Sequence, residues 1–354
     1  MKSLTLSTIQ QEFPDLVSKR LGNDGQVLGF ASAEAYLPGE MIFLDGKHDL
    51  AQLLPDPPTA IATTAEQAEK LSVHKKIGIL VCEDVRLAHA LIRQRYDDRD
   101  LHQHEWPRIH PSAIIHPSVH VPDSATVGPG AVVGCDTVLG EGVVVQANTV
   151  IEYSSNIGDQ SVLQSQVFIG HDCVIGKRVI VKPGSVIGAE GFGFSPDQTK
   201  RYHRVPQKGI VVIEDDVVIG SNCNIDRATY GETRIARGTK LDSLCHIAHN
   251  VFVDEDCIVV AQTGIAGSSR LGKRVIISGQ TAISDHKTVV DDVIMVHRCG
   301  VTEDILKPGM YAATPARPFN EYIRNIATFH KLYKLRRDFN DLAQQVKKLI
   351  AGTN

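Results

Sequence analysis

The sequence has little of the features that mark membrane, secreted and nucleic-acid-binding proteins. No apolar run approaches the length of a membrane span, and the N-terminal stretch "MKSLTLSTIQQEFPDL" has no apolar core long enough for a signal peptide. The formal net charge is −4, so the overall basic character that accompanies nucleic-acid binding is missing. We therefore expect a cytoplasmic protein with no membrane span and no nucleic-acid partner.

Cysteine pairs and aromatic residues are also scarce. The seven cysteines form no Cys-x-x-Cys pair and are odd in number, which favours reduced, mostly buried thiols in a cytosolic chain. Aromatic residues make up 5%, whereas Gly is plentiful at 29 residues, a pairing that fits many tight turns and a core of small side chains. The cysteines are Cys82, Cys135, Cys173, Cys223, Cys245, Cys257 and Cys299.

A six-residue repeat occupies over half of the chain. From about residue 114 the sequence divides into sixes such as "VVGCDT VLGEGV VVQANT", in which the first position is nearly always Ile, Val or Leu. This period predicts a β-helix solenoid, in which each six is a short strand plus a turn and three sixes close one coil. Neighbouring coils then bury each other's aliphatic residues.

The parts that flank the repeat predict two further segments. Residues 1–108 mix helix and strand patterns and form a small α/β domain, and residues 109–312 form the solenoid. Residues 313–354 form a helical segment that begins near Phe319. Its apolar residues recur at spacings of three and four, which favours self-association, although packing on its own domain is the alternative. They are Leu332, Leu335, Phe339, Leu342, Val346 and Leu349.

One interruption, residues 188–209, breaks the repeat, and a solenoid ejects such an insertion as a loop, often on the binding face. Its cations suit either a solvated loop or a contact for phosphate. They are Lys200, Arg201, His203, Arg204 and Lys208.

The repeat also predicts which residues share one corner of the solenoid. Residues eighteen apart lie one above another, so Gly267 lies one coil from His249, and His286 lies two coils away, shifted by one position. This set suits acyl transfer, because a neutral imidazole takes a proton from an attacking amine and a glycine N–H stabilises an oxyanion. His246 is a weaker candidate, since it is a position that often faces outward.

These residues and four longer motifs resemble the UDP-3-O-acylglucosamine N-acyltransferases of lipid A biosynthesis, the LpxD family of hexapeptide-repeat acyltransferases. The motifs are "GAEGFGF", "IDRATYGETRIARGTKLDSLCHIAHNV", "GIAGSSRLGKRVIISGQTAISDH" and "KPGMYAATPARP". The resemblance covers almost the whole chain. It implies a mainly β fold, a left-handed parallel β-helix with an N-terminal α/β uridine-binding domain and a C-terminal helical extension.

The resemblance also implies a reaction and its residues. The enzyme would be a cytoplasmic homotrimer with no bound cofactor. It would move a 3-hydroxyacyl chain from the 4'-phosphopantetheine of acyl carrier protein to the 2-amino group of UDP-3-O-acyl-glucosamine. His249 would be the general base, Gly267 the oxyanion donor, His286 an aid to binding and Asp242 an orienting acid. Substrate-binding roles would fall to Phe43, Asp45, His203, His246 and Asn250.

Several positions depart from the family pattern. The family binds uracil between two aromatic rings, from a pattern like Phe-Leu-x-Asn-x-x-Tyr. In "FLDGKHD", residues 43–49, Gly46 replaces the Asn and Asp49 replaces the Tyr, so one of the two rings is lost unless His48 substitutes for it. Near the base, Ser243, His246 and Ala228 stand where Asn, Gln and Gly are usual. These changes keep open a paralogue with another nucleotide amino sugar as its acceptor.

Three alternatives remain. The donor is either acyl carrier protein or coenzyme A, and the basic C-terminal helix suits an acidic carrier protein or is simply solvated. A zinc hydratase would need three His around one metal, but His286 lies two coils from His246 and His249, roughly 10 Å away. A non-catalytic scaffold would leave the alignment of His249 with Gly267 unexplained. The basic residues of the helix are Lys331, Lys334, Arg336, Arg337, Lys347 and Lys348.

Overall fold

A computed structural model describes residues 4–45, 57–71 and 76–351. The chain divides into two compact units, residues 1–100 and residues 101–354, and each is considered by itself. Gly46, His48 and Asp49, which carry the departures in the expected uracil clamp, lie outside the described residues.

The first unit is a small α/β domain, as the flanking sequence predicts. Its main sheet has the order β2-β7-β6-β5-β4, in which only β2 is antiparallel to its neighbour. The strands of the unit are β1 (Leu4–Thr5), β2 (Val17–Gly22), β3 (Gln26–Val27), β4 (Gly29–Phe30), β5 (Glu40–Leu44), β6 (Ala60–Thr63) and β7 (Gly78–Cys82). The helices are α1 (Leu6–Glu12), α2 (Ala65–Leu71) and α3 (Val85–Tyr96). The two faces of the sheet pack into separate apolar clusters, because alternate strand residues point to opposite sides.

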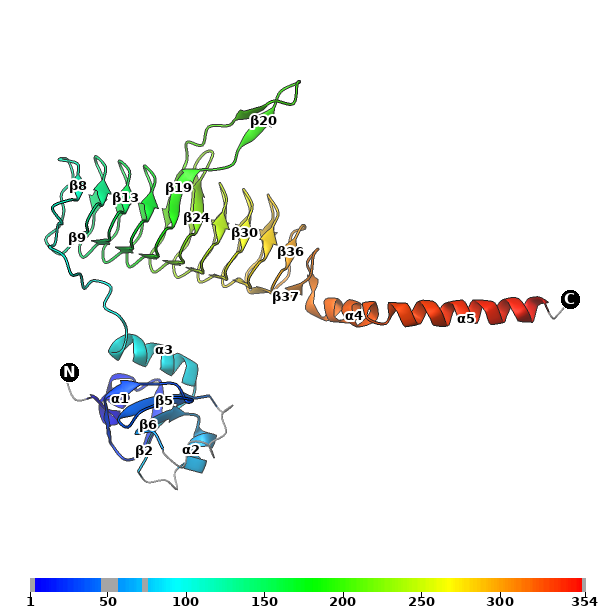
Figure 1. The fold of residues 1–354 in the computed structure, drawn as a ribbon, viewed down its shortest axis with the longest axis horizontal. Helices are drawn as coiled ribbons and strands as arrows, with labels where there is room; N and C mark the ends of the chain where they lie inside the picture. The colour runs from blue at the N-terminus through cyan, green and yellow to red at the C-terminus, as the bar shows by residue number, and fades with distance from the viewer. Residues whose placement is uncertain (1–3, 46–56, 72–75, 352–354) are drawn as a thin grey trace. The chain divides into compact units, whose positions relative to one another are not determined.

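The second unit is a parallel β-solenoid built from three long sheets, which Figure 1 shows as a ladder of short strands. Sheet 1 contains β8 (Ile114–Ile115), β10 (Val132–Val133), β13 (Val150–Ile151), β16 (Phe168–Ile169), β19 (Val186–Glu190), β24 (Asn224–Arg227), β27 (His246–Ile247), β30 (Gly264–Ile265), β33 (Ala282–Ile283) and β36 (Gly300–Val301). Sheet 2 contains β11 (Val138–Leu139), β14 (Asn156–Ile157), β17 (Val174–Ile175), β22 (Ile210–Ile213), β25 (Glu232–Ile235), β28 (Phe252–Val253), β31 (Arg270–Leu271) and β34 (Thr288–Val289). Sheet 3 contains β9 (Thr126–Val127), β12 (Val144–Val145), β15 (Val162–Leu163), β18 (Ile180–Val181), β23 (Val218–Ile219), β26 (Lys240–Leu241), β29 (Ile258–Val259), β32 (Ile276–Ile277), β35 (Val293–Met295), β37 (Gly309–Ala312) and β38 (Arg317–Pro318).

The register confirms the predicted coil of eighteen residues, since Val132 pairs with Val150. Each coil turns through left-handed residues that recur every six positions, such as Asn148 and Ser154 with φ near +57°. Asn and Asp tolerate this conformation better than most side chains, which explains why they are frequent at these positions. The fold class expected from the repeat, a mainly β protein on a parallel β-helix, is confirmed.

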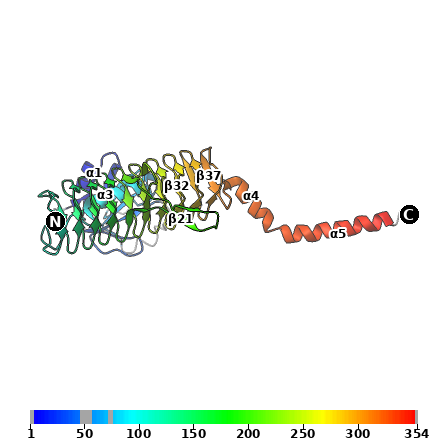
Figure 2. The same cartoon turned by 90° about the horizontal axis from the view of Figure 1, so that it is seen from above.

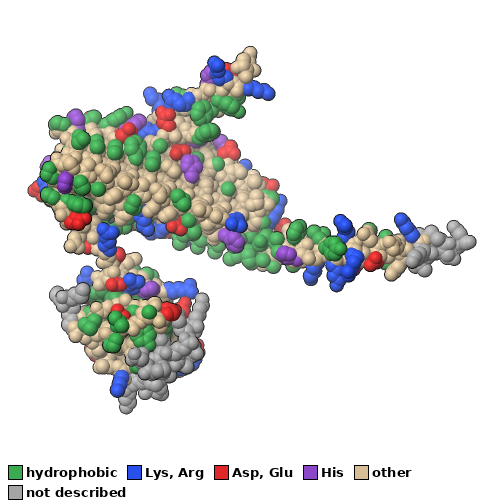
Figure 3. All heavy atoms as spheres, viewed as in Figure 1, with side chains coloured by type: hydrophobic (Ala, Val, Ile, Leu, Met, Phe, Trp, Pro, Cys, Tyr) green, Lys and Arg blue, Asp and Glu red, His purple; other side chains and the backbone are tan. Residues whose placement is uncertain are grey.

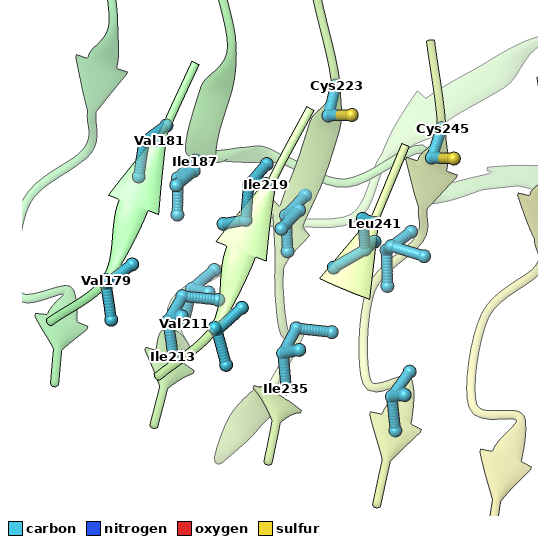
Figure 4. Packing of buried hydrophobic residues seen from close by; sticks show 14 of the residues in the cluster. Val179, Val181, Ile187, Val211, Ile213, Ile219, Cys223, Ile235, Leu241 and Cys245 are labelled. Carbon is cyan, nitrogen blue, oxygen red and sulfur yellow. The ribbon is translucent and has the colours of Figure 1, made fainter. Parts of the chain in front are cut away.

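Aliphatic side chains from all three sheets stack inside the coils. Figure 4 shows residues of this column from successive coils, including Ile187, Ile219, Leu241 and the two cysteines Cys223 and Cys245. Buried hydroxyls share the interior at little cost where they donate to a backbone carbonyl, as Ser185 does to the Gly220 carbonyl at 2.7 Å.

Two coils depart from the period. Val186 pairs with Asn224, 38 positions later, because the insertion adds a hairpin of β20 (Phe194–Pro196) and β21 (Tyr202–Arg204) that stands out from the coils in Figure 1. Asn224 then pairs with His246, 22 positions later, so that coil carries four extra residues. The segment "YGETR", which at first sight is a six-residue unit shortened by one, therefore lies in a lengthened coil.

The C-terminal segment is helical as predicted, but it forms two helices, α4 (Phe319–Phe329) and α5 (Leu332–Ala351), rather than one. The backbone tightens at His330, whose N–H points to the carbonyls of both Ile326 and Thr328. Figure 2 shows the two helices following one another beyond β37. The apolar seam of α5 is exposed at Leu332, Leu335, Phe339, Leu342 and Val346. The side chain of Leu349 lies outside the described residues.

Candidate active site

The predicted corner exists, and three coils build it. His249 lies in the turn after β27, and the pairing of β27 with β30 puts Gly267 in the same place one coil later. Backbone hydrogen bonds fix this stack: the His249 carbonyl accepts from Ser268 N–H at 2.9 Å, and the Gly267 carbonyl accepts from His286 N–H at 3.0 Å. His249, Gly267 and His286 are therefore brought together as expected.

The His249 imidazole lies directly over Gly267. A Cβ atom added to Gly267 would lie 2.6 Å from Cε1 and 2.7 Å from Nε2 of the ring. Any side chain at this position would displace the ring, so glycine lets the imidazole lie where it does. Within the described part of the chain the Gly267 N–H meets no hydrogen-bond acceptor.

The two ends of the hairpin insertion close the other side of His249. A Cβ atom on Gly191 would lie 2.8 Å from His249 Cβ and 3.3 Å from Gln207 Oε1. Gln207 is buried and accepts a hydrogen bond from the Thr229 hydroxyl at 2.8 Å. The imidazole is thus held between the insertion on one side and the next coil on the other.

Asn250 fixes the tautomer of His249. Its Oδ1 accepts from Thr229 N–H at 3.0 Å, and its Nδ2 donates to the Tyr230 carbonyl at 2.8 Å, so the orientation of the amide is set. His249 Nδ1 lies 3.2 Å from the same Oδ1 and must therefore be the donor. The proton then sits on Nδ1, which leaves a lone pair on Nε2, the atom above Gly267.

A carboxylate that sequence reasoning missed lies beside these histidines. Asp226, on β24, is 7% exposed, and its Oδ2 lies 3.6 Å from Nε2 of His246. Burial raises the pKa of Asp226, and the charges of His246 and His249 oppose this rise. The only sequence signal was the "IDR" motif, because the lengthened coil hides the alignment of Asp226 with His246.

Asp242 lies elsewhere in the coil. It follows β26 in sheet 3, and its carboxylate accepts from the N–H groups of Ser243 at 2.7 Å and Ala261 at 3.2 Å. These contacts shape the turn between coils, and the orienting role expected for Asp242 stays a prediction. His286 is exposed, with Nδ1 3.3 Å from the carboxylate of Asp285.

The hairpin cations are partly neutralised by their own loop. His203 Nε2 lies 2.8 Å from Asp197, and this hydrogen bond is the main reason that the pKa of Asp197 falls to about 2. Arg204 pairs with Glu190 at 2.7 Å. Figure 3 shows Lys and Arg side chains beside hydrophobic ones on this hairpin and along the C-terminal helices. The exposed aromatic residues of the hairpin are Phe192, Phe194 and Tyr202.

Phe43 lines a depression of about 470 Å³ within the first unit. Its ring centroid lies 4.5 Å from that of His89 on α3 and 6.0 Å from that of Phe30. Burial lowers the pKa of His89, and the nearby Arg93 adds to this. Asp45 pairs with Arg86 at 3.3 Å.

Residues 4–45, 57–71 and 76–351 contain no group of three or more His, Cys, Asp or Glu that could hold a metal ion. Within the same ranges, no helix is both long and apolar enough to cross a membrane.

Comparison with known proteins identifies the family. The chain is 46% identical over 348 residues to the UDP-3-O-acylglucosamine N-acyltransferase of Methylococcus capsulatus, covering 98% of each chain. It is 32% identical over 312 residues to that of Bordetella pertussis, covering 86% of each. The chain belongs to the UDP-3-O-acylglucosamine N-acyltransferase family. It is an acyltransferase enzyme, as the resemblance implied.

Other matches cover less of the chain. Residues 109–191 match the family described as GMPPB C-terminal domain. The crystal structure of UDP-N-acetylglucosamine O-acyltransferase (LpxA) from Moraxella catarrhalis is 27% identical, with a TM-score of 0.48 over 60% of this chain and 73% of that one.

Proposed function

We propose that this acyltransferase moves a 3-hydroxyacyl chain from acyl carrier protein to the 2-amino group of UDP-3-O-acyl-glucosamine, giving UDP-2,3-diacylglucosamine in lipid A biosynthesis. Both family members compared above carry the name of this acceptor. The observation that carries the proposal is the orientation of His249, whose Nε2 is left as a proton acceptor above the free N–H of Gly267.

The proposed mechanism needs no protein nucleophile. The amine nitrogen attacks the thioester carbonyl carbon while His249 Nε2 takes a proton from the nitrogen. The carbonyl oxygen becomes an oxyanion, which the Gly267 N–H stabilises. The oxyanion then collapses, the carbon–sulfur bond breaks, and the departing thiolate takes the proton from the imidazolium. An amide and the free thiol of the 4'-phosphopantetheine arm result.

His286 has a separate role in this proposal. Its N–H donates to the Gly267 carbonyl, so it lies next to the proposed oxyanion donor. Its exposed imidazole lies beside the carboxylate of Asp285. An imidazole there can donate a hydrogen bond to a phosphate of the donor arm or of the acceptor. Asn250, expected to bind substrate, has its amide engaged by the protein and acts instead by orienting His249.

The partners follow from exposed surfaces. The seam of α5 presents Leu332, Leu335, Phe339, Leu342 and Val346 to solvent in the single chain, which supports the homotrimer that the resemblance implied. The basic residues on the same helix support docking of acyl carrier protein, which is acidic. The thioester donor supplies its own phosphopantetheine, so the enzyme needs no bound cofactor.

A different acceptor is the second candidate. Phe43 is the ring that was expected to stack on uracil. The rings of His89 and Phe30 both lie beside it, so Phe43 already has two aromatic neighbours within the protein. An enzyme with this arrangement suits another nucleotide amino sugar as well as UDP-3-O-acyl-glucosamine.

An acyl-transfer assay tests the proposal. The wild type and His249→Ala are compared with acyl-carrier-protein thioester or acyl-CoA as donor and with UDP-3-O-acyl-glucosamine or other nucleotide amino sugars as acceptor. We expect carrier-dependent acylation that falls by about 10³-fold in the mutant. His120→Ala, which changes an exposed histidine near the start of the solenoid, serves as the control. Equal activity of His249→Ala and the wild type would refute the assignment of the base.

A further inference from the structure

Asp226 is a buried acid that the mechanism above leaves unused. It lies on β24, directly below β27, because the pairing of Asn224 with His246 brings these strands into register. Its side chain is 9% exposed, and its nearest charged partner is the half-exposed His246, at 3.6 Å. A carboxylate that is nearly removed from water is costly unless nearby charges balance it.

The charged groups that act on Asp226 come from β27 and the turn that follows it. The arrangement suggests that the two histidines are the cations that act on it, because the other cations have partners of their own. Arg227 donates to the carbonyls of Gly188, Gly209 and His171, and Arg204 and Arg234 pair with glutamates. The ionisable groups on the surrounding strands are His246 and, just after β27, His249; Glu190 on β19; Arg227 on β24 itself; and Glu232 and Arg234 on β25.

His249 needs such an anion. The Nδ1 partner of His249 is Asn250, a neutral amide that orients the ring but carries no charge. When Nε2 takes the amine proton, the ring becomes a cation held against Gly191 and Gly267, with little room for water. A fixed negative charge in a partly buried site stabilises that cation more than it would in water.

We propose that Asp226 is a positioning residue whose carboxylate stabilises the imidazolium form of His249 during acyl transfer, and that His246 shares this carboxylate. The inference rests on the proposed role of His249 as general base. Orientation of the base then comes from Asn250, and its countercharge comes from the preceding coil. Asp226 takes no proton in the step: the proton passes from the amine to Nε2 and then to the thiolate.

The test measures kcat and KM against pH for the full-length enzyme and for Asp226→Asn. We expect kcat to fall about tenfold with both KM values little changed, because an isosteric amide removes only the charge. We expect the acidic limb of the kcat profile to move down by roughly one pH unit, since a base without its anion is harder to protonate. Asp254→Asn, which removes one negative charge from the coil of His249, should leave the profile unchanged.

A second variant covers the case in which Asp226→Asn does not fold, which its thermal unfolding midpoint would reveal. His246 is half exposed, so His246→Gln leaves the core intact. It frees the carboxylate for His249 alone, and the acidic limb should therefore move to higher pH, opposite to the shift in Asp226→Asn.

The outcomes separate this inference from the proposed function. A folded Asp226→Asn with an unchanged pH profile overturns the inference, as does a lower kcat with an unmoved acidic limb, which would indicate a merely structural role. A His246→Gln limb that stays in place or moves to lower pH also overturns it. A wild type without acyl-transfer activity overturns both, whereas an active wild type with an inactive His249→Ala leaves the proposed function standing whatever Asp226 does.

Discussion

Replacing Gly267 with alanine tests the geometry of the site with a single methyl group. The added Cβ would lie 2.6 Å from His249 Cε1, whereas a normal carbon–carbon contact is about 3.5 Å, so the ring must retreat by about 0.9 Å. The insertion limits retreat on the other side, since its backbone at Gly191 lies so close that a Cβ there would be 2.8 Å from His249 Cβ and 3.2 Å from His249 Cδ2. A displacement of this size costs about a hundredfold in kcat when it misaligns a catalytic group.

The fold should survive this change. Gly267 lies outside the left-handed region of φ, so alanine adds no backbone strain there. Gly264, three residues earlier on β30, is the matched control, because a Cβ at that position meets nothing within 4 Å. We expect Gly264→Ala to keep near-normal kcat and both variants to keep the unfolding midpoint of the wild type. If Gly267→Ala retained more than a third of the kcat of Gly264→Ala, the confinement of His249 would be refuted.

Three further predictions concern other contacts. Asn250→Ala should lower kcat by about ten- to a hundredfold by releasing the tautomer of His249, whereas Asn250→Asp, which keeps the acceptor oxygen but adds a charge at Nδ1, should move the acidic limb of the kcat profile to higher pH; an unmoved limb would contradict the role. Arg227→Met should destabilise the enzyme by about 3 kcal/mol in denaturant unfolding, because three buried carbonyls lose their donor, and a change below about 1 kcal/mol would show that water replaces it. Phe339→Glu on the exposed seam should reduce the oligomer mass in sedimentation, while Lys334→Glu should not; a stable oligomer in Phe339→Glu would place the interface elsewhere.

The sequence contained enough to predict the corner because the solenoid has a constant period. A spacing of eighteen residues between His249 and Gly267 becomes a contact only when every coil between them has the same length, and here that holds. The shift of one position at His286 is also real: its backbone follows Asn250 and Ser268 in the series of left-handed residues. Local periodicity therefore specified neighbours in space without a structure.

The same reasoning failed where the period breaks. Counting eighteen back from His246 leads to Ala228, but four extra residues move the pairing to Asn224 and bring Asp226 beside the histidine. Asp242 was suggested by resemblance rather than by period, and a separation of seven residues from His249 spans a turn into another sheet. The tautomer of His249 could not be predicted either, because Thr229, which fixes the Asn250 amide, belongs to the inserted residues.

The lengthened coil therefore bears on the chemistry of the site. A regular coil would give His249 only the short turn residues of its neighbours, and none of those is a buried acid. The four extra residues carry Thr229 and Tyr230 over Asn250, and the coil that contains them brings Asp226 under His246. Under the roles proposed for His249 and Asp226, orientation and countercharge come from different residues, so the resting imidazole is not locked into an ion pair through Nδ1. A base that must be neutral before each turnover and charged during it benefits from this separation, since a carboxylate at Nδ1 would favour the charged form at rest.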